Sequence, residues 1–346
     1  MSNFFGLLQA RGSLLNYINC KLYKLQSKKQ LREWLGIKNS SFFRFSNLAH
    51  NISPLISTKN GKRRLIEVPS PALRQVQANI LSFLTRLDYP AYLFSGLKKR
   101  DFIGNASQHS VNKYVFKLDI SKFFPSISRE YVYRFFRTVL ETSADVAEIL
   151  TNCTTTNIIM ARYDNADVKE SVVDFIKQYN LPIAHLTTGA PTSMLLSYLC
   201  NRSMFDEIHL FSSANAWTFS IYVDDITISS NSPIKYELRK QIIQIIKSHG
   251  YSVSMKKTKY YTPNKMKTIT GVAIDRHGKL RTPNKLLFKA HQKITEYKSK
   301  NLSITSWQSL RGTIGVSNRI DGKFSQLIKK MKLDIRDEEN NEYKKV

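Results

Sequence analysis

Two adjacent carboxylates divide the stretch FSIYVDDITISS, residues 219–230, into two short runs of alternating apolar residues. This alternation predicts two β-strands, and the Asp-Asp pair between them predicts a turn, because aspartate tolerates unusual backbone angles. Asp224 and Asp225 carry like charges and repel each other unless something neutralises them. Taken alone, the pair is most simply interpreted as a turn that faces water.

A third carboxylate changes this interpretation. The stretch KYVFKLDI, residues 113–120, alternates in the same way and predicts a strand with Asp119 near its end. If Asp119 lies beside Asp224 and Asp225, the three acids form a site for hard divalent cations, which prefer oxygen ligands. Two Mg²⁺ ions in such a site can activate an attacking hydroxyl and stabilise the leaving oxygen of a phosphoryl transfer.

The charge of the chain indicates the kind of partner. With 53 Lys and Arg against 26 Asp and Glu, the net charge is +27 and the pI is about 9.9. Such a surface repels itself, so we expect a polyanionic partner, with nucleic acid favoured over an anionic membrane. No run of about 18 apolar residues and no signal peptide is present, which predicts a soluble, cytoplasmic protein without a membrane partner.

Metal-binding and nucleotide-binding motifs of other classes are not found in the sequence. The three cysteines are scattered and lack a C-x-x-C pair, which argues against disulfides and a structural zinc site. No G-x-x-x-x-G-K-[ST] loop occurs, so a P-loop ATPase is not supported.

Hydrophobic periodicity predicts the order of elements. At 346 residues the chain is long enough for two or three units, and it reads as a basic helical extension over 1–50, then a mixed α+β body, then a basic helical tail. A hairpin is expected at Asn60-Gly61, while residues 151–180 allow no assignment. Helices are predicted over 72–87, 190–211 and about 233–250, and strands over 251–261 and 267–275.

Several segments together resemble the motifs of reverse transcriptases, in the same order. LDISKFFPSI around Asp119, GAPTSMLLSYL from Gly189, and YVDD at 222–225 resemble motifs A, B and C. GKRRLIEVPSPALRQVQ resembles the fingers motif, and GYSVSMKKT and ITGVAI resemble later motifs, so the resemblance covers about residues 60–280. It implies an α+β right-hand polymerase, with fingers and palm over 51–275 and a basic helical thumb and tail over 276–346.

Two short strings resemble the retron type of reverse transcriptase. NASQH, with Asn105 and His109, matches an N-A-x-x-H signature, and ITG at 269–271 matches a V-T-G signature except for Ile269. The resemblance implies a bacterial RNA-directed DNA polymerase that copies a cognate structured noncoding RNA into a branched, RNA-linked DNA (msDNA). It also implies antiphage defence with a separately encoded effector protein.

The resemblance assigns roles to residues around the acids. Asp119, Ile120, Asp224 and Asp225 would bind the two Mg²⁺ ions, and the three aspartates would be catalytic. Lys257 would act as the general acid for the leaving pyrophosphate, although Lys256 beside it leaves that assignment open.

The resemblance also predicts contacts with the incoming dNTP. Lys62, Arg63 and Arg64 would bind its triphosphate, with Arg64 the best match, although a solvated charge run is the alternative. Phe124 would lie under the sugar and exclude a ribose 2′-OH, although a core phenylalanine beside Phe123 fits the pattern nearly as well. The turn that begins motif B would complete the nucleotide site with Thr188, Gly189 and Ala190.

The basic tail predicts RNA contacts. Residues 256–300 hold thirteen Lys and Arg against Asp275 and Glu296, which favours phosphate neutralisation over a solvated helix face. Trp307 is expected to pack within the thumb. In the tail, the residues predicted to bind RNA are Lys279, Arg281, Lys285 and Lys289, and the resemblance to the retron signature adds Asn105 and His109.

The chain also departs from the family pattern, and other functions stay open. Thr188 stands where the family usually has Gln, and Val223 where retron enzymes more often have Ala. The nearest alternative is another defence-associated or intron-maturase-like reverse transcriptase. A noncatalytic RNA-binding scaffold is a more distant one, because a fold does not establish an activity.

Overall fold

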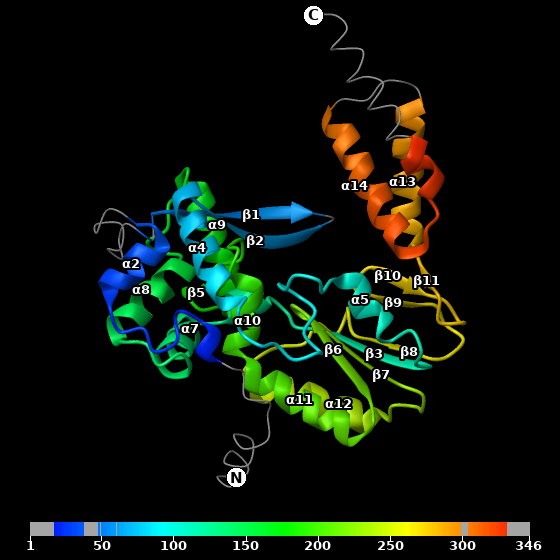
Figure 1. The fold of residues 1–346 in the computed structure, drawn as a ribbon, viewed down its shortest axis with the longest axis horizontal. Helices are drawn as coiled ribbons and strands as arrows, with labels where there is room; N and C mark the ends of the chain where they lie inside the picture. Colours follow the sequence, from blue (N-terminus) through cyan, green and yellow to red (C-terminus); the bar gives the residue numbers. More distant parts are fainter. Residues whose placement is uncertain (1–16, 38–47, 49, 60, 299–303, 331–346) are drawn as a thin grey trace, which may run out of the picture. The chain divides into compact units, whose positions relative to one another are not determined.

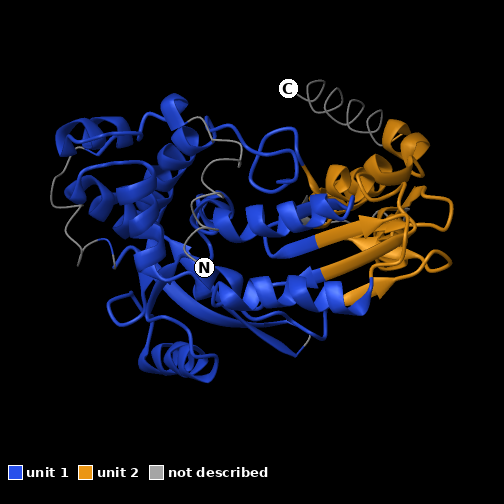
Figure 2. Cartoon of the chain, turned by 90° about the horizontal axis from the view of Figure 1, so that it is seen from below, with its two compact units in different colours: residues 1–100, 118–226, 235–258 blue, residues 101–117, 227–234, 259–346 orange. Residues whose placement is uncertain are grey.

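The computed structural model describes residues 17–37, 48, 50–59, 61–298 and 304–330. The chain divides into two compact units, and each of them draws on separate segments of the sequence (Figure 2). Unit 1 comprises residues 1–100, 118–226 and 235–258, and unit 2 comprises 101–117, 227–234 and 259–346. The three domains predicted over 1–50, 51–275 and 276–346 stay a prediction. The two compact units divide the chain at other positions.

Unit 1 holds most of the helices (Figure 1). Helices α2, α4 and α8 pack together, and α11 packs along α12. The described elements of unit 1 are η1 (Tyr17–Asn19), α2 (Lys28–Leu35), β1 (Ile52–Lys59), β2 (Lys62–Pro69), α4 (Pro71–Leu84), α6 (Phe123–Ser126), α7 (Arg129–Arg134), the π-helical turn η3 (Phe135–Val139), α8 (Ala144–Thr154), β4 (Thr155–Asn157), α9 (Ala166–Gln178), β5 (Ala184–Leu186), α10 (Ser193–Cys200), α11 (Arg202–Ala214), β6 (Thr218–Tyr222) and α12 (Tyr236–Ser248).

Unit 2 combines a short sheet with a helical pair. Its elements are α5 (Phe102–Ser107), β8 (Lys259–Tyr261), β9 (Lys267–Ile269), β10 (Val272–Ile274), β11 (Leu280–Arg281), α13 (Asn284–Lys298) and α14 (Ile304–Asp321). Strands β11, β10 and β9 form an antiparallel sheet whose apolar side chains pack with Ala106 of α5. Helix α13 packs on α14 through Ala290, Leu310 and Ile314.

A four-stranded sheet in the order β6-β7-β3-β8 includes β3 (Tyr114–Asp119) and β7 (Asp225–Ser230). Strand β3 is central, and side chains of both its faces are buried, including Val115 and Phe116. The sheet confirms the predicted strand over 113–120 and the predicted strands on either side of the Asp-Asp pair. Mixed helix and antiparallel sheet confirm the α+β class.

The predicted hairpin at Asn60-Gly61 is confirmed. Strands β1 and β2 pair antiparallel from Ile52 with Pro69 to Lys59 with Lys62, and Gly61 has the left-handed φ of +71° that such a turn favours. Residues 151–180, unassigned from sequence, form the end of α8, then β4 and α9. Helix α9 packs on β1, where Phe175 and Val172 join Leu65 of β2 in one apolar cluster.

Other predicted elements are confirmed, with two corrections. Helix α4 confirms the helix over 72–87, and α2 ends at Gly36, whose φ is +72°. The single helix predicted over 190–211 is wrong, because α10 and α11 are separate. The break falls at Asn201, whose side chain donates to the Ser197 carbonyl and accepts from the Tyr251 hydroxyl, so it offers the backbone an alternative to the helical ladder.

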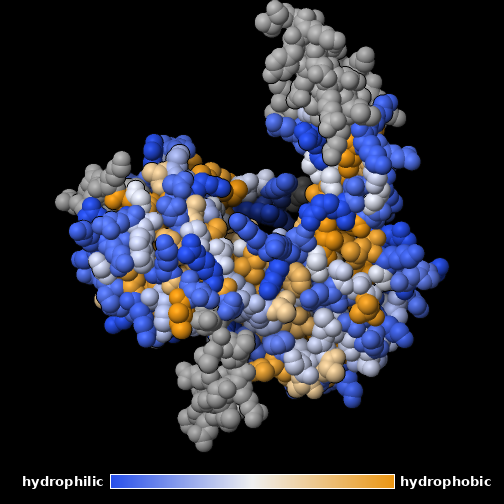
Figure 3. Space-filling view, in the orientation of Figure 1, coloured by the Kyte–Doolittle hydropathy of each residue, from blue (hydrophilic) through white to orange (hydrophobic). Residues whose placement is uncertain are grey.

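The strand predicted over 251–261 is correct only for its end, β8. Residues 254–258 form a turn instead, in which the Lys257 N–H donates to the Ser254 carbonyl at 3.0 Å. Within the described part of the chain, no helix combines the length and apolar character needed to cross a membrane. On the face shown in Figure 3, hydrophilic residues cover most of the described surface and apolar residues form patches among them.

Candidate active site

The Asp-Asp turn is held by a segment that precedes it in the chain. Val223 and Asp224 join β6 to β7, and Val223 has a φ of +59°, a left-handed value that is uncommon for a β-branched residue. Its N–H donates to the Ser95 hydroxyl at 3.0 Å. Ile221, two residues earlier, donates its N–H to the Tyr92 carbonyl at 2.9 Å. Residues 92–95 therefore fix the turn that presents the acids.

The end of β3 brings Asp119 to the same place. The N–H of Ile120 donates to the carbonyl oxygen of Asp224 at 3.0 Å, and the N–H of Ser254 donates to the carbonyl oxygen of Asp119 at 2.8 Å. Asp119 is buried at 5% exposure. Carboxylates 105 positions apart in the sequence thus meet through backbone pairing of the strand ends.

The pKa of Asp224 reflects its burial and the charges of the neighbouring acids. Burial raises the pKa of Asp224, and the charges of Asp119 and Asp225 raise it further, to about 6, while Lys257 opposes the shift. Each carboxylate makes ionisation of the next one less favourable. A bound cation would relieve this repulsion.

A lysine already lies against the acids. The Lys257 ammonium is 2.7 Å from both oxygens of the Asp119 carboxylate, whose side chain is 7% exposed against 50% for the lysine. Lys122 lies over the Tyr179 ring at 4.0 Å, and its pKa is lowered by burial and then by Lys257. Lys257, which is predicted to be the general acid, therefore lies beside the carboxylates that are predicted to be catalytic.

The donor set fits Mg²⁺ in its chemistry. Asp119, Asp224 and Asp225 supply the oxygen atoms that hard divalent cations prefer, and the backbone of Ile120 lies between the strand ends. Among the described residues, no three His, Cys, Asp or Glu side chains are arranged as a ready set of metal ligands. Both oxygens of Asp119 are bonded to Lys257 instead.

The β1–β2 hairpin separates the three predicted triphosphate ligands. Lys62 and Arg64 are exposed on β2. The Arg63 guanidinium instead donates to the Ser171 carbonyl at 3.2 Å and to the Gln178 side chain at 3.5 Å, both on α9. Arg63 therefore attaches the hairpin to α9, which leaves Lys62 and Arg64 as the better candidates for the triphosphate.

The remaining nucleotide residues lie in unit 1 as well. Phe124 is half-buried in α6, beside the buried ring of Phe123 at 6.3 Å between centroids. Thr188, Gly189 and Ala190 form the turn before α10, and the Thr188 N–H donates to the Glu67 carboxylate at 2.7 Å. That contact ties the motif B turn to β2.

The two residues of the N-A-x-x-H signature lie inside unit 2. Asn105 and His109 are both 0% exposed, so RNA cannot contact their side chains directly in this conformation. The Asn105 amide lies 3.4 Å from the Thr270 hydroxyl, and His109 Nδ1 lies 2.6 Å from the Ser229 hydroxyl. The structure therefore contradicts the prediction that this pair contacts RNA directly, and the two side chains make internal contacts instead.

The predicted basic RNA-binding residues are on the surface of unit 2. All four are exposed, and Arg281 forms an ion pair with Asp275 at 2.9 Å. Trp307 stacks on Tyr297 at 5.4 Å, which confirms that it packs between α13 and α14. The four residues are Lys279, Arg281, Lys285 and Lys289.

Sequence reasoning missed Glu67 and His185, both fully buried in unit 1. A signal for Glu67 was available, because alternation along β2 places it on the same side as the buried Leu65 and Pro69. His185 gave no comparable signal, since its partner is 118 positions away.

The strand ends thus define an acid cluster with an adjacent lysine, as expected for a nucleotidyl-transfer site. Residues 56–297 match the family model of the reverse transcriptases (RNA-dependent DNA polymerases), and the chain belongs to this family.

Curated relatives narrow the type. The chain is 30% identical over 209 residues to the retron Se72 reverse transcriptase of Salmonella heidelberg, which covers 58% of this chain and 47% of that protein. It is 24% identical over 274 residues to the retron Ec83 reverse transcriptase of Escherichia coli, which covers 77% of this chain and 82% of that protein. The chain thus spans about half the length of the first relative. The predicted resemblance to bacterial retron reverse transcriptases is confirmed.

Proposed function

We propose that this chain is an RNA-directed DNA polymerase that uses dNTPs. The observation that carries the proposal is the meeting of Asp119 and Asp224 at the ends of β3 and the β6–β7 hairpin, where burial and then the charge of Asp119 raise the pKa of Asp224. Membership of the reverse transcriptase family supports the same conclusion.

Asp119 and Asp224 would hold two Mg²⁺ ions, with Asp225 and Ile120 at the same edge. Bound Mg²⁺ would supply activation of the attacking hydroxyl and stabilisation of the leaving oxygen. The protein's own part is to keep the carboxylates close together on paired strand ends, where burial and then mutual repulsion raise the pKa of Asp224.

The nucleotide would lie among side chains of unit 1. Lys62 and Arg64 would bind its triphosphate through charge-assisted hydrogen bonds, and Phe124 would restrict the sugar. Thr188, Gly189 and Ala190 would line the site from the turn before α10. Lys257, whose ammonium lies 2.7 Å from Asp119, would hold a proton at Nζ for the leaving pyrophosphate.

The relatives are retron reverse transcriptases by name, which supports a finer proposal. The template would be a cognate structured noncoding RNA, and the product a branched, RNA-linked DNA (msDNA) made in antiphage defence with a separate effector protein. The four exposed basic residues from Lys279 to Lys289 would bind RNA phosphates. The three free cysteines support a reducing, cytoplasmic setting.

Asp224→Asn tests the activity. We expect dNTP incorporation on an RNA template to fall at least about 1,000-fold, the size of effect that loss of one electrostatic catalytic group produces, while RNA binding is retained. Asp167→Asn, an exposed substitution on α9, serves as the matched control. Unchanged DNA synthesis by the Asp224→Asn variant would refute the site. A wild-type chain that binds RNA but synthesises no DNA would favour a noncatalytic scaffold.

Sequencing the nucleic acid that copurifies with the chain tests the finer proposal. A branched RNA-linked DNA is expected. Unbranched host RNA alone would favour an intron-maturase-like or other defence-associated enzyme.

A further inference from the structure

Glu67 is a buried carboxylate on the strand that carries Lys62 and Arg64. Leu65, Glu67 and Pro69 alternate with exposed residues along β2, and Glu67 is 0% exposed. Burial of a carboxylate is costly unless hydrogen bonds or an opposite charge compensate for it. The partners of the Glu67 carboxylate therefore show which segment β2 is attached to.

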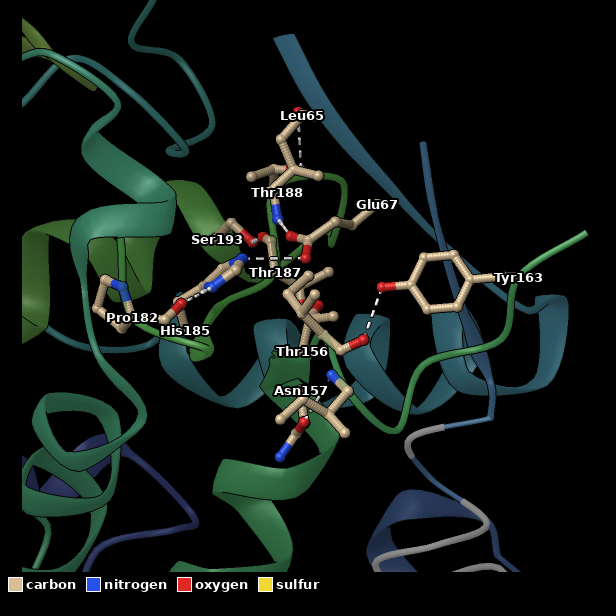
Figure 4. Close-up of polar contacts among 12 residues, drawn as sticks. Leu65, Glu67, Thr156, Asn157, Tyr163, Pro182, His185, Thr187, Thr188 and Ser193 are labelled. Atoms are coloured by element: carbon tan, nitrogen blue, oxygen red, sulfur yellow. Dashed lines mark hydrogen bonds and ion pairs between the residues drawn. The ribbon is translucent and has the colours of Figure 1, made fainter. Parts of the chain in front are cut away.

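Both carboxylate oxygens of Glu67 point to the segment before α10 (Figure 4). Oε1 lies 3.0 Å from His185 Nε2, and Oε2 accepts from the Thr188 N–H at 2.7 Å. The Thr188 hydroxyl also donates to the Leu65 carbonyl at 3.3 Å. A Cβ on Gly189 would lie 2.1 Å from the Glu67 carbonyl oxygen, so the two backbones meet with no room for a side chain.

The hydrogen-bond partners of His185 show which of its ring nitrogens carries a proton. Nδ1 lies 2.7 Å from the Pro182 carbonyl, which can only accept, so Nδ1 carries a proton. Burial lowers the pKa of His185, but Glu67 and the Pro182 carbonyl outweigh it, and the pKa is raised overall. Tyr163 also senses the Glu67 charge, and burial and that charge raise its pKa to about 12, so it stays neutral. One proton is then shared between His185 Nε2 and Glu67 Oε1, and the raised pKa of His185 favours that proton on the imidazole.

We propose that Glu67 is a positioning residue for the incoming nucleotide, because it fixes the β2 strand that carries Lys62 and Arg64 against the turn formed by residues 188–190. The inference rests on the proposed function, in which both segments contact one dNTP. Loss of this link should weaken nucleotide binding more than the chemical step, because β3 and the β6–β7 hairpin carry the acids.

Two substitutions separate the geometry of the link from its charge. Glu67→Ala leaves the Thr188 N–H and His185 without their partner. Glu67→Gln can keep both contacts, because its amide oxygen accepts from Thr188 and its amide nitrogen donates to neutral His185 Nε2. Glu170→Ala removes an exposed carboxylate on α9 and is the matched control.

The experiment measures primer extension by the full-length chain on poly(rA)/oligo(dT) with dTTP. Glu67→Ala should raise the KM for dTTP about tenfold, as expected when a buried hydrogen-bonding group is left unpaired, with kcat within about threefold of wild type. Glu67→Gln should restore a KM close to wild type, and Glu170→Ala should not differ from it. An unchanged KM in a folded Glu67→Ala variant would overturn the inference.

A pH series decides the matter if Glu67→Ala does not fold. As the pH rises past the raised pKa of His185, the wild-type pair loses its shared proton, whereas Glu67→Gln does not need that proton. The ratio of the Glu67→Gln KM to the wild-type KM should therefore fall with rising pH, and a constant ratio would overturn the inference.

Titration of ¹³C-labelled histidine by NMR, with His185 assigned from the spectrum of His185→Gln, gives a readout independent of activity. The His185 pKa should lie above 6.5 in wild type and below 6.5 in Glu67→Gln. A wild-type value below 6.5 would contradict the charged pair. An inactive wild-type chain would overturn the proposed function together with the positioning role, whereas an active chain with an unchanged Glu67→Ala KM would overturn the positioning role alone.

Discussion

Two histidines, one in each unit, are equally buried, but their pKa values are shifted in opposite directions. His185 in unit 1 and His109 in unit 2 are both 0% exposed, and each uses Nδ1 in a hydrogen bond. Beside Glu67 the pKa of His185 is raised, whereas burial lowers the pKa of His109 to about 3. One neighbouring carboxylate is therefore enough to reverse the direction in which burial alone shifts the pKa of an imidazole.

The surroundings of His109 suit a neutral ring. Its Nδ1 lies 2.6 Å from the Ser229 hydroxyl on β7, which also accepts from the Asn112 amide at 2.7 Å. The Lys267 ammonium donates to the Asn112 carbonyl at 2.8 Å. We infer that this network joins the end of α5 to β7, the strand that begins at Asp225, and that it gives the N-A-x-x-H signature a structural role.

Gly189→Ala should have the largest effect, because it disrupts the contact between β2 and the turn near His185. The new Cβ would lie 2.1 Å from the Glu67 carbonyl oxygen, and a backbone atom cannot move aside as a flexible side chain can. We expect the free energy of unfolding to fall by about 3 kcal/mol, with loss of dNTP incorporation, measured by urea denaturation and primer extension.

Gly312→Ala is the matched control for this substitution. Gly312 lies in α14 with open space where its Cβ would be, so the same change should leave stability equal or slightly higher. A Gly189→Ala variant with wild-type stability would show that β2 and the turn are not held as closely as the structure indicates.

The pH dependence of stability should separate the two histidines. The pKa of His109 is about 3 in the folded chain against an ordinary value of 6.5. The stability that goes with the neutral ring is therefore fully present above pH 6.5 and is lost as the pH falls toward 3. At pH 5 this loss amounts to about 2 kcal/mol. His109→Gln should flatten the stability curve between pH 6.5 and 5 by about that amount, measured by chemical denaturation.

His185 should act in the opposite direction. Because its folded pKa is raised, its contribution is present below 6.5 and is lost as the pH rises through the folded value. His185→Gln should therefore cost less stability at alkaline than at weakly acidic pH. Parallel curves for the two variants would mean that the pKa values of the two imidazoles are not shifted in opposite directions.

Ser229→Ala should give the smallest effect and test the network without changing a charge. It removes the acceptor of the Asn112 amide and the partner of His109, which should lower the free energy of unfolding by about 1 kcal/mol, with no change in pH dependence. Ser107→Ala, at an exposed position of α5, is the control. Equal results for the two serine variants would argue against a contribution from the network.

Prediction from sequence succeeded where the signal was local. Alternation located β3 and the strands around Asp224, and Asn60-Gly61 located the β1–β2 hairpin, because side-chain period and turn chemistry are properties of neighbouring residues. It failed where a distant partner intervened. Tyr251 bonds Asn201 at the break between α10 and α11, and Asn105 and His109 are buried although the resemblance to the retron signature predicted RNA contacts for them.

The sequence by itself determined the identities and order of the chemistry-bearing motifs, because these are written in consecutive residues. Only the tertiary structure decided which of them meet. It placed Lys257 on Asp119, drew Arg63 away to α9, and paired Glu67 with His185 across 118 positions. The physical reason is that burial and distant charges, which set hydrogen bonding and pKa, exist only once remote segments have packed together.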